Sequence, residues 1–389
     1  ALPISRSFVN DSPVPVGVLQ ELSSRLVDIH SQPQSLMLSA VGVADTLMLG
    51  GLDQNAMAAV SLATKFQFVQ NMIVSIFVAA LIALGAQYWG KKDHVSISKL
   101  FFITLRLNGV ISILFFIGCE FFPGLVMRAF TQDAELIDIA VAARIVETLW
   151  AISLSFRKGY LRPEFKHLFR RDALLSGDYY RTMLPLLGGG MLWTVGFTAY
   201  SAFMGHIDQD APAANSIASS VMELVCCMCN GLASGGGILV GNCLGAGDLE
   251  RGKLYGIRIV KLSVLCGIVS SGVMFAITPL LLTIVHLNDT AMGYLQGMLP
   301  VMGVYIIGRV INTITINGIF TAGGDTMFDF YSLAVTMWGI ALPLAALGTF
   351  VFHWPVWLIY ACTCVDEVGK IPWVMLHFRK YKWVRDLTR

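Results

Sequence analysis

Charged residues are scarce in this sequence. Asp, Glu, Lys and Arg make up 13% of its 389 residues, about half the share found in an ordinary soluble domain. Hydrophobic residues make up 56%, and apolar runs recur from Leu36 to Met375 with short polar breaks between them. This pattern excludes a soluble fold and is typical of an all-α, polytopic membrane protein in which each run spans the bilayer as a helix.

Strong net charge and common enzyme motifs are absent as well. A formal net charge of +2 gives no reason to expect a nucleic-acid partner. The sequence has no Walker phosphate loop, no HExxH and no GxSxG motif, which argues against direct use of ATP and against an enzyme. Six of the eight cysteines lie inside or at the ends of apolar runs, so we interpret them as packing residues and expect no metal site and no cofactor.

About ten runs have the length that a bilayer span requires. They cover residues 36–52, 57–88, 96–119, 136–156, 182–204, 212–243, 255–277, 293–320, 327–351 and 354–377. Lys and Arg gather in every second loop and at the end of the chain, within residues 91–99, 157–171, 251–258 and 379–389. By the positive-inside rule, we expect a multi-pass protein of the plasma or inner membrane with both termini in the cytoplasm.

An internal repeat organises the chain. Residues 53–63 read DQNAMAAVSLA and residues 208–218 read DQDAPAANSIA, with seven identities in eleven positions at an offset of 155. The same offset pairs Gly90 with Gly245 and Asp93 with Asp248. Two copies running in the same sense predict two pseudo-symmetric helical bundles, and a site between two such bundles is typical of transporters.

The first copy is shorter than the second. It runs for 126 residues from Asp53 to Asp178, whereas the second runs for 182 residues from Asp208 to the last residue. The difference corresponds to about two spans with their turns. We therefore expect five parts: a polar entry segment (1–35), an incomplete first lobe (36–156), a basic cytoplasmic linker (157–178), a second lobe (179–378) and a basic cytoplasmic tail (379–389).

Several motifs in order resemble the multidrug and toxic compound extrusion (MATE) family of cation-coupled secondary exporters. They are VADTLMLGGLDQNAMAAVSLA (43–63), LPLLGGGMLW (184–193), AANSIASSVMELV (213–225), ILVGNCLGAGD (238–248) and GIFTAGGDT (318–326). The resemblance implies two six-helix lobes, a central cavity for organic cations and related drugs, and exchange for protons or sodium. By that count the chain lacks the fifth and sixth helices of the family. We expect a monomer that binds small cationic or amphipathic molecules and the lipid bilayer.

Two carboxylates inside predicted spans are candidates for ion coupling. Asp45 matches the acidic residue that the family carries in its first helix, and it could take up a proton or bind sodium together with Thr46 and Asn71. Glu223 lies near mid-depth in the second copy, where its counterpart in the first copy is Phe68. An acid in one of two equivalent places indicates a role with a proton, sodium or substrate, and a buried structural pair is the alternative.

Four further charges lie within predicted spans: Arg309, Asp366, Glu367 and Lys370. Asp366 and Lys370 are four residues apart on one helix, and Arg309 could reach Glu367 from another span. We interpret all four as structural ion pairs.

Aromatic and thioether side chains could line a cavity for a lipophilic cation. The candidates are Phe66, Phe68, Trp193, Tyr200 and Met222. Trp193 and Val310 align with positions where some family members carry an acid, so this sequence departs from the family there. The sequence thus predicts antiport-driven efflux by alternating access between two lobes. The alternative is a non-transporting remnant of such a transporter, inserted in the membrane but inactive.

Overall fold

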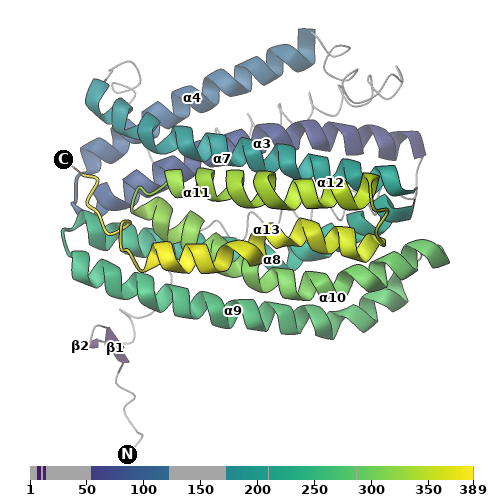
Figure 1. The fold of residues 1–389 in the computed structure, drawn as a ribbon. Helices are drawn as coiled ribbons and strands as arrows, with labels where there is room; N and C mark the ends of the chain where they lie inside the picture. The colour runs from purple at the N-terminus through teal and green to yellow at the C-terminus, as the bar shows by residue number, and fades with distance from the viewer. Residues whose placement is uncertain are drawn as a thin grey trace, which may run out of the picture.

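The computed structural model describes residues 7–9, 12–14, 54–121, 172–208, 210–285 and 287–388. Long helices lie side by side in these ranges (Figure 1). They are α3 (Gln54–Gly90), α4 (His94–Phe121), α7 (Ala173–Ile207), α8 (Asp210–Gly245), α9 (Leu249–Ile284), α10 (Asp289–Asn312) and α13 (Val356–Phe378). A π-helical stretch, η2 (Thr313–Phe320), continues α10. Another, η3 (Ala334–Ala341), joins α11 (Met327–Leu333) to α12 (Leu342–Phe350). A short hairpin pairs β1 (Ser7–Val9) with β2 (Ser12–Val14).

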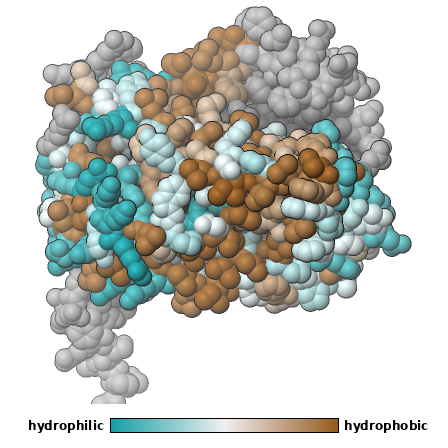
Figure 2. Space-filling view, viewed as in Figure 1, coloured by the Kyte–Doolittle hydropathy of each residue, from teal (hydrophilic) through white to brown (hydrophobic). Residues whose placement is uncertain are grey.

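The prediction of a polytopic helical membrane protein is confirmed. Seven continuous helices in the described ranges are long and apolar enough to cross a bilayer, and α13 adds a 23-residue helix that carries Asp366, Glu367 and Lys370. These eight helices coincide with eight of the ten predicted spans; the other two, 36–52 and 136–156, lie outside the described residues. A hydrophobic band crosses the middle of the helices, and hydrophilic residues gather toward their ends (Figure 2).

The two ends of the helices differ in charge. One end, called the basic end below, carries Lys91 and Lys92 after α3, Arg251 and Lys253 at the start of α9, and the segment that follows α13. The other, the acidic end, carries Asp208 and Asp210 at the turn from α7 to α8 and Asp289 at the start of α10.

Two hydrophobic cores correspond to the two bundles. The larger core is built from α8, α9, α10, η2 and α13 and includes Val240, Leu299 and Ile314. The smaller core joins α3 and α4 to the first half of α7. Tyr179 of α7 fixes that junction: its hydroxyl donates a hydrogen bond to Phe77 O (2.9 Å) and accepts one from Thr104 Oγ1 (3.1 Å). Helix α7 therefore belongs to both bundles.

The repeat seen in the sequence reappears at the crossing of α3 and α8. A Cβ at Gly90 would collide with the backbone of Asn242, and a Cβ at Gly245 would collide with the backbone of Gln87. Because these two contacts are equivalent under the offset of 155, the helices cross about a pseudo-twofold axis. The turns that follow are equivalent too, since Lys92 (φ 62°) and Gly247 (φ 80°) both adopt left-handed backbone conformations.

Short polar side chains begin the helices that follow these turns. Asp93 Oδ1 accepts the backbone N–H of Ser96 (3.1 Å), and Asp248 Oδ1 accepts that of Arg251 (3.1 Å). Each supplies an acceptor to a free N–H group in the first helical turn. Asp248 is thus the N-cap residue of α9.

The segment after α13 closes the basic end. Trp383 is fully buried, and its ring occupies the space that a side chain at Gly256 of α9 would need. Leu387 N donates to Gln87 Oε1 (2.6 Å), and Gln87 Nε2 donates to Ala322 O (2.7 Å). Helix α3, the turn after η2 and the C-terminal segment are thus tied together through one buried glutamine.

Candidate functional site between the two bundles

A polar stripe runs along α8. Ser216, Ser220, Glu223 and Asn230 recur at helical spacing on one side of the helix, and all four are exposed. The same side continues into the contact with α3 at Gly241 and Gly245. Because polar and charged side chains are costly to expose to lipid, this stripe is best explained as the wall of a water-accessible space between the bundles.

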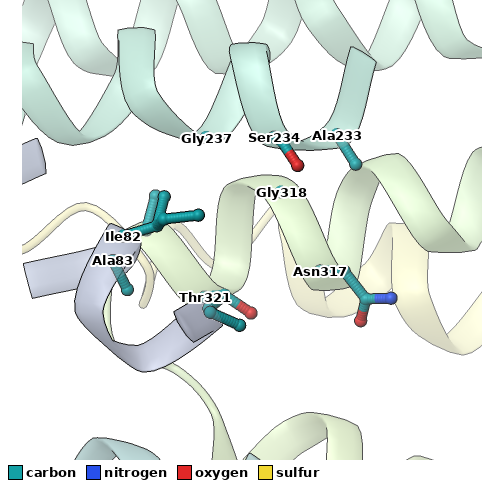
Figure 3. Close-up of a pocket in the computed structure, with 10 residues that line it drawn as sticks. Ile82, Ala83, Ala233, Ser234, Gly237, Asn317, Gly318 and Thr321 are labelled. Atoms are coloured by element: carbon teal, nitrogen blue, oxygen red, sulfur yellow. The ribbon is translucent and has the colours of Figure 1, made fainter. Parts of the chain in front are cut away.

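A small pocket lies where the stripe meets α3 (Figure 3). It has a volume of about 60 Å³ and is lined by Ala79, Ile82 and Ala83 of α3, by Ala233, Ser234 and Gly237 of α8, and by Asn317, Gly318, Thr321 and Ala322 in and after η2. Ala79 and Ser234 are equivalent in the repeat, as are Ile82 and Gly237. The pocket is too small for a drug-sized molecule, which needs about 300 Å³ or more. It therefore marks the narrow end of the space along the stripe.

Glu223, an ion-coupling candidate, lies on this stripe. Its side chain is exposed and within electrostatic range of Arg309 in α10. The Arg309 guanidinium lies 5.4 Å from the centre of the Trp193 ring, which suits a cation–π contact. A carboxylate, a guanidinium and an indole from three helices thus share one region.

Arg309 also connects this region to buried charges. Its Nη1 lies 2.8 Å from Glu367 Oε1, which is the pairing expected from the sequence. Lys370 Nζ lies 3.1 Å from Glu367 Oε2, and Asn312 Nδ2 donates to the same Oε2 (2.8 Å) and to Glu367 O (2.7 Å). Glu367 is 2% exposed. A buried carboxylate with this many donors is well compensated.

The expected partner of Lys370 was wrong. The sequence suggested Asp366 four residues before it, but the structure pairs Lys370 with Glu367, three residues before it. Both spacings bring side chains together on a helix. Glu367 is one methylene longer and already faces Arg309 and Asn312, so the ammonium joins an existing group of charges.

Asp366 is left without that partner. Its side chain is 3% exposed, and Oδ1 has no hydrogen-bond partner among the described residues. Tyr200 Oη and Asn312 Oδ1 share that condition, as does Asn242 Oδ1 near the crossing with α3. Sequence reasoning missed Asn312, although it lies three residues after Arg309 and therefore on the same helix face.

The remaining candidates are placed as follows. Asp45 lies outside the described residues; Phe66, Phe68 and Asn71 fall within α3, but their side chains lie outside the described part. Tyr200 is buried in a small core with Met337, Ala341 and Leu342, and Trp193 packs against that core. Met222 packs against the larger core. In this conformation Tyr200 therefore does not contribute to an exposed aromatic surface.

The family model MatE matches residues 34–156 and 185–347, well over half of the sequence. This chain belongs to the MatE family. Members of this family are transporters rather than enzymes, and they use ion gradients rather than cofactors. Membership agrees with the repeat, the membrane-length helices and the paired bundles, and it confirms the resemblance drawn from the sequence motifs.

One curated relative is a probable multidrug resistance protein NorM of Rhizobium meliloti (strain 1021), which is 24% identical over 311 residues. The match covers 62% of this chain and 66% of the relative, so the chain spans just under two thirds of the length of the relative it matches.

Solved structures of MATE transporters share the fold. A transporter of the MOP superfamily from Pyrococcus furiosus has a TM-score of 0.75 at 12% identity, over 91% of this chain and 94% of that one. An outward-facing multidrug resistance MATE transporter has a TM-score of 0.74 at 12% identity, over 90% and 93%. A MATE protein in a bent conformation also has a TM-score of 0.74 at 12% identity, over 91% and 95%.

Proposed function

We propose that this chain is a secondary active exporter of organic cations and related amphipathic molecules, driven by antiport of protons or sodium. The observation that carries the proposal is Glu223, an exposed carboxylate at the membrane interior on a polar stripe that leads into the pocket between the bundles. A carboxylate there attracts a cation, and Trp193, whose ring contacts the Arg309 guanidinium, lies in the same region.

Alternating access fits the crossing of α3 and α8. The glycines there bring the helix backbones into close contact at the basic end, and a close crossing of small residues can act as a pivot between two bundles. With the basic end in the cytoplasm, as the distribution of Lys and Arg predicts, we propose that this crossing closes the cytoplasmic side and that the stripe opens toward the outside.

The test is transport by the purified chain in liposomes. Vesicles are loaded with a fluorescent lipophilic cation, and a proton gradient or a sodium gradient is imposed in separate runs. We expect gradient-driven efflux from the unmutated chain and its loss in Glu223→Gln, which keeps side-chain size but removes the charge. Glu250→Gln, at an exposed glutamate in the first turn of α9, is the matched control and should transport normally.

Two outcomes would count against the proposal. Undiminished coupled efflux in Glu223→Gln would remove this carboxylate from the mechanism. Absence of efflux even from the unmutated chain, with normal insertion and folding, would favour a non-transporting remnant. Comparing the two gradients identifies the coupling ion, for which Asp45 with Asn71 is the proposed contact in the first bundle.

A further inference from the structure

The charges inside the second bundle are unevenly shared. Both nearby cations, Arg309 and Lys370, make their ion pairs with Glu367, and Asn312 adds two hydrogen bonds to the same residue. Asp366 is adjacent in sequence and equally buried, yet neither ion pair includes it. One carboxylate is therefore fully compensated while its neighbour is not.

The surroundings of Asp366 suit a group that exchanges a proton. Asp366 Oδ1, Tyr200 Oη and Asn312 Oδ1 are all buried oxygens without partners in the described part of the chain, and the three residues are 3%, 9% and 1% exposed. Tyr200 lies within electrostatic range of Asp366, and Asn312 is hydrogen-bonded to the neighbouring Glu367. A buried acceptor without a donor is costly, and protonation lowers this cost because the carboxyl group becomes neutral and carries its own O–H donor.

Other titratable or charged groups face this interior from every helix packed around it. They are Tyr200 on α7, Glu223, Cys226 and Cys229 on α8, Tyr305 and Arg309 on α10, Asp329 on α11, and Tyr360, Cys364, Glu367 and Lys370 on α13. Among the acids in this set, Glu367 has its cations, and Glu223 is exposed on the stripe. Asp329 lies against Gly189 of α7, which makes it a useful comparison for Asp366.

We propose that Asp366 is the proton-carrying carboxylate of the second bundle, and that it exchanges its proton with the medium while Glu223 binds the cationic substrate. This rests on the proposed function, which it deepens by naming the coupled ion and its carrier. A proton taken up on one side of the membrane bonds to Asp366 and forms a neutral carboxyl group. The same O–H bond breaks when the proton is released to the opposite side, which restores the carboxylate.

Arg309 links the two events. It pairs with Glu367 next to Asp366 and also lies within electrostatic range of Glu223. Protonation of Asp366 adds one positive charge to this group, which disfavours a second cation at Glu223. Removal of the proton has the opposite effect. Mutual exclusion of proton and cationic substrate is the condition that antiport requires.

Infrared difference spectroscopy on the detergent-solubilised chain tests this without any transport. As the pH is lowered, the unmutated chain should gain the C=O stretching band of a buried protonated carboxyl group, and Asp366→Asn should lack that band. Asp329→Asn, the matched control, should keep it. Tyr200→Phe should keep the band but move its frequency, because a buried polar group within electrostatic range of Asp366 has been removed; this variant also guards against a misfolded Asp366→Asn.

Transport then separates this proposal from the one on which it rests. Asp366→Asn should lose efflux driven by a proton gradient while retaining exchange of labelled for unlabelled substrate at equal pH. A titrating band that persists in Asp366→Asn would overturn the proposal, even if the unmutated chain shows normal efflux. A carboxylate band that responds to sodium at constant pH would also overturn it in favour of a sodium site. If the unmutated chain shows the band but no efflux, the proton site stands and the proposed transport fails.

Discussion

Gly90 and Gly245 occupy equivalent positions in the two copies of the repeat, and each abuts the backbone of the opposite copy. The residues whose backbone they contact, Asn242 and Gln87, are also equivalent in the repeat. Between them, Ala86 Cβ approaches Gly241, its own counterpart, to within 2.9 Å of where a Cβ would stand. The pseudo-twofold axis of the molecule therefore passes through this crossing.

Alanine at either glycine should destabilise the protein. Gly245→Ala places a methyl group against the backbone of Gln87, which cannot move aside as a flexible side chain could, and we expect a loss of about 1–3 kcal/mol. Gly235→Ala in the same helix, where no neighbouring atom lies within 4 Å of the added Cβ, should be neutral or slightly stabilising. Thermal unfolding in detergent compares them, and equal melting temperatures would contradict the close crossing.

The buried ion pairs make Glu367 more important for stability than its neighbour. Glu367→Gln breaks the ion pairs of both Arg309 and Lys370, and breaking a buried pair by removing one partner costs about 3–5 kcal/mol. Asp366→Asn breaks no ion pair and should cost less. The comparison uses the fraction of monodisperse protein recovered after heating. A variant at Asp366 that is less stable than Glu367→Gln would refute this assignment of partners.

In transport, Glu223 should matter more than Asp45. Glu223 lies on the polar stripe beside Arg309, whereas the sequence places Asp45 in the shortened copy. We expect Glu223→Gln to abolish gradient-driven efflux and Asp45→Asn to reduce it in part, at equal expression. The measurement is the initial efflux rate from matched proteoliposomes. A larger loss of efflux in Asp45→Asn than in Glu223→Gln would assign ion coupling to the first bundle.

The orientation of the bundles can be tested by labelling. Single cysteines at Lys92 and Lys380, both exposed at the basic end, should react with a membrane-impermeant maleimide only after the cytoplasmic side is made accessible. A cysteine at Asp289, exposed at the acidic end, should react in intact cells. A background chain without the native cysteines is the control. Labelling of Lys380→Cys in intact cells would invert the proposed topology.

Lowering the pH should destabilise the turn at the acidic end that contains Asp208. Partial burial disfavours the charged form of Asp208, but hydrogen bonds from Tyr294 Oη (2.6 Å) and the backbone N–H of Ala211 (2.7 Å) outweigh it and lower the pKa of Asp208 below 3.8. Since the pKa is lower in the folded state, the stabilisation is complete above 3.8 and is lost as the pH falls through the folded value. The free energy of unfolding should fall less steeply with decreasing pH in Asp208→Asn than in the unmutated chain. An unchanged pH dependence would show that this carboxylate does not contribute to it.

The sequence predicts the helices and their symmetry well because both follow from patterns of residue type. Apolar runs of span length identify the helices, and the offset that pairs Gly90 with Gly245 also pairs the two contacts at the crossing. The cap at Asp248 follows from its position after a glycine turn. These features depend on local sequence and on the repeat, so they can be read without coordinates.

Partners inside the second bundle could not be predicted in the same way. Residues three and four positions apart on a helix are both neighbours, so the sequence could not decide whether Lys370 would meet Glu367 or Asp366. The choice depends on α10, which brings Arg309 and Asn312 against Glu367. The burial of Tyr200 likewise depends on the π-helical turn of η3 that presents Met337.

The crossing at Ala86 and Gly241 also limits how the two copies can differ. In a dimer of identical subunits, one residue at this place would meet its own copy, and every substitution would appear on both sides at once. Because both copies lie in one chain, each can differ from the other, as Phe68 and Glu223 do. At the axis the residues are small in both copies: alanine faces glycine, and glycines stand at both outer contacts. One half can thus carry a charge that the other lacks while the junction of the halves keeps its close packing.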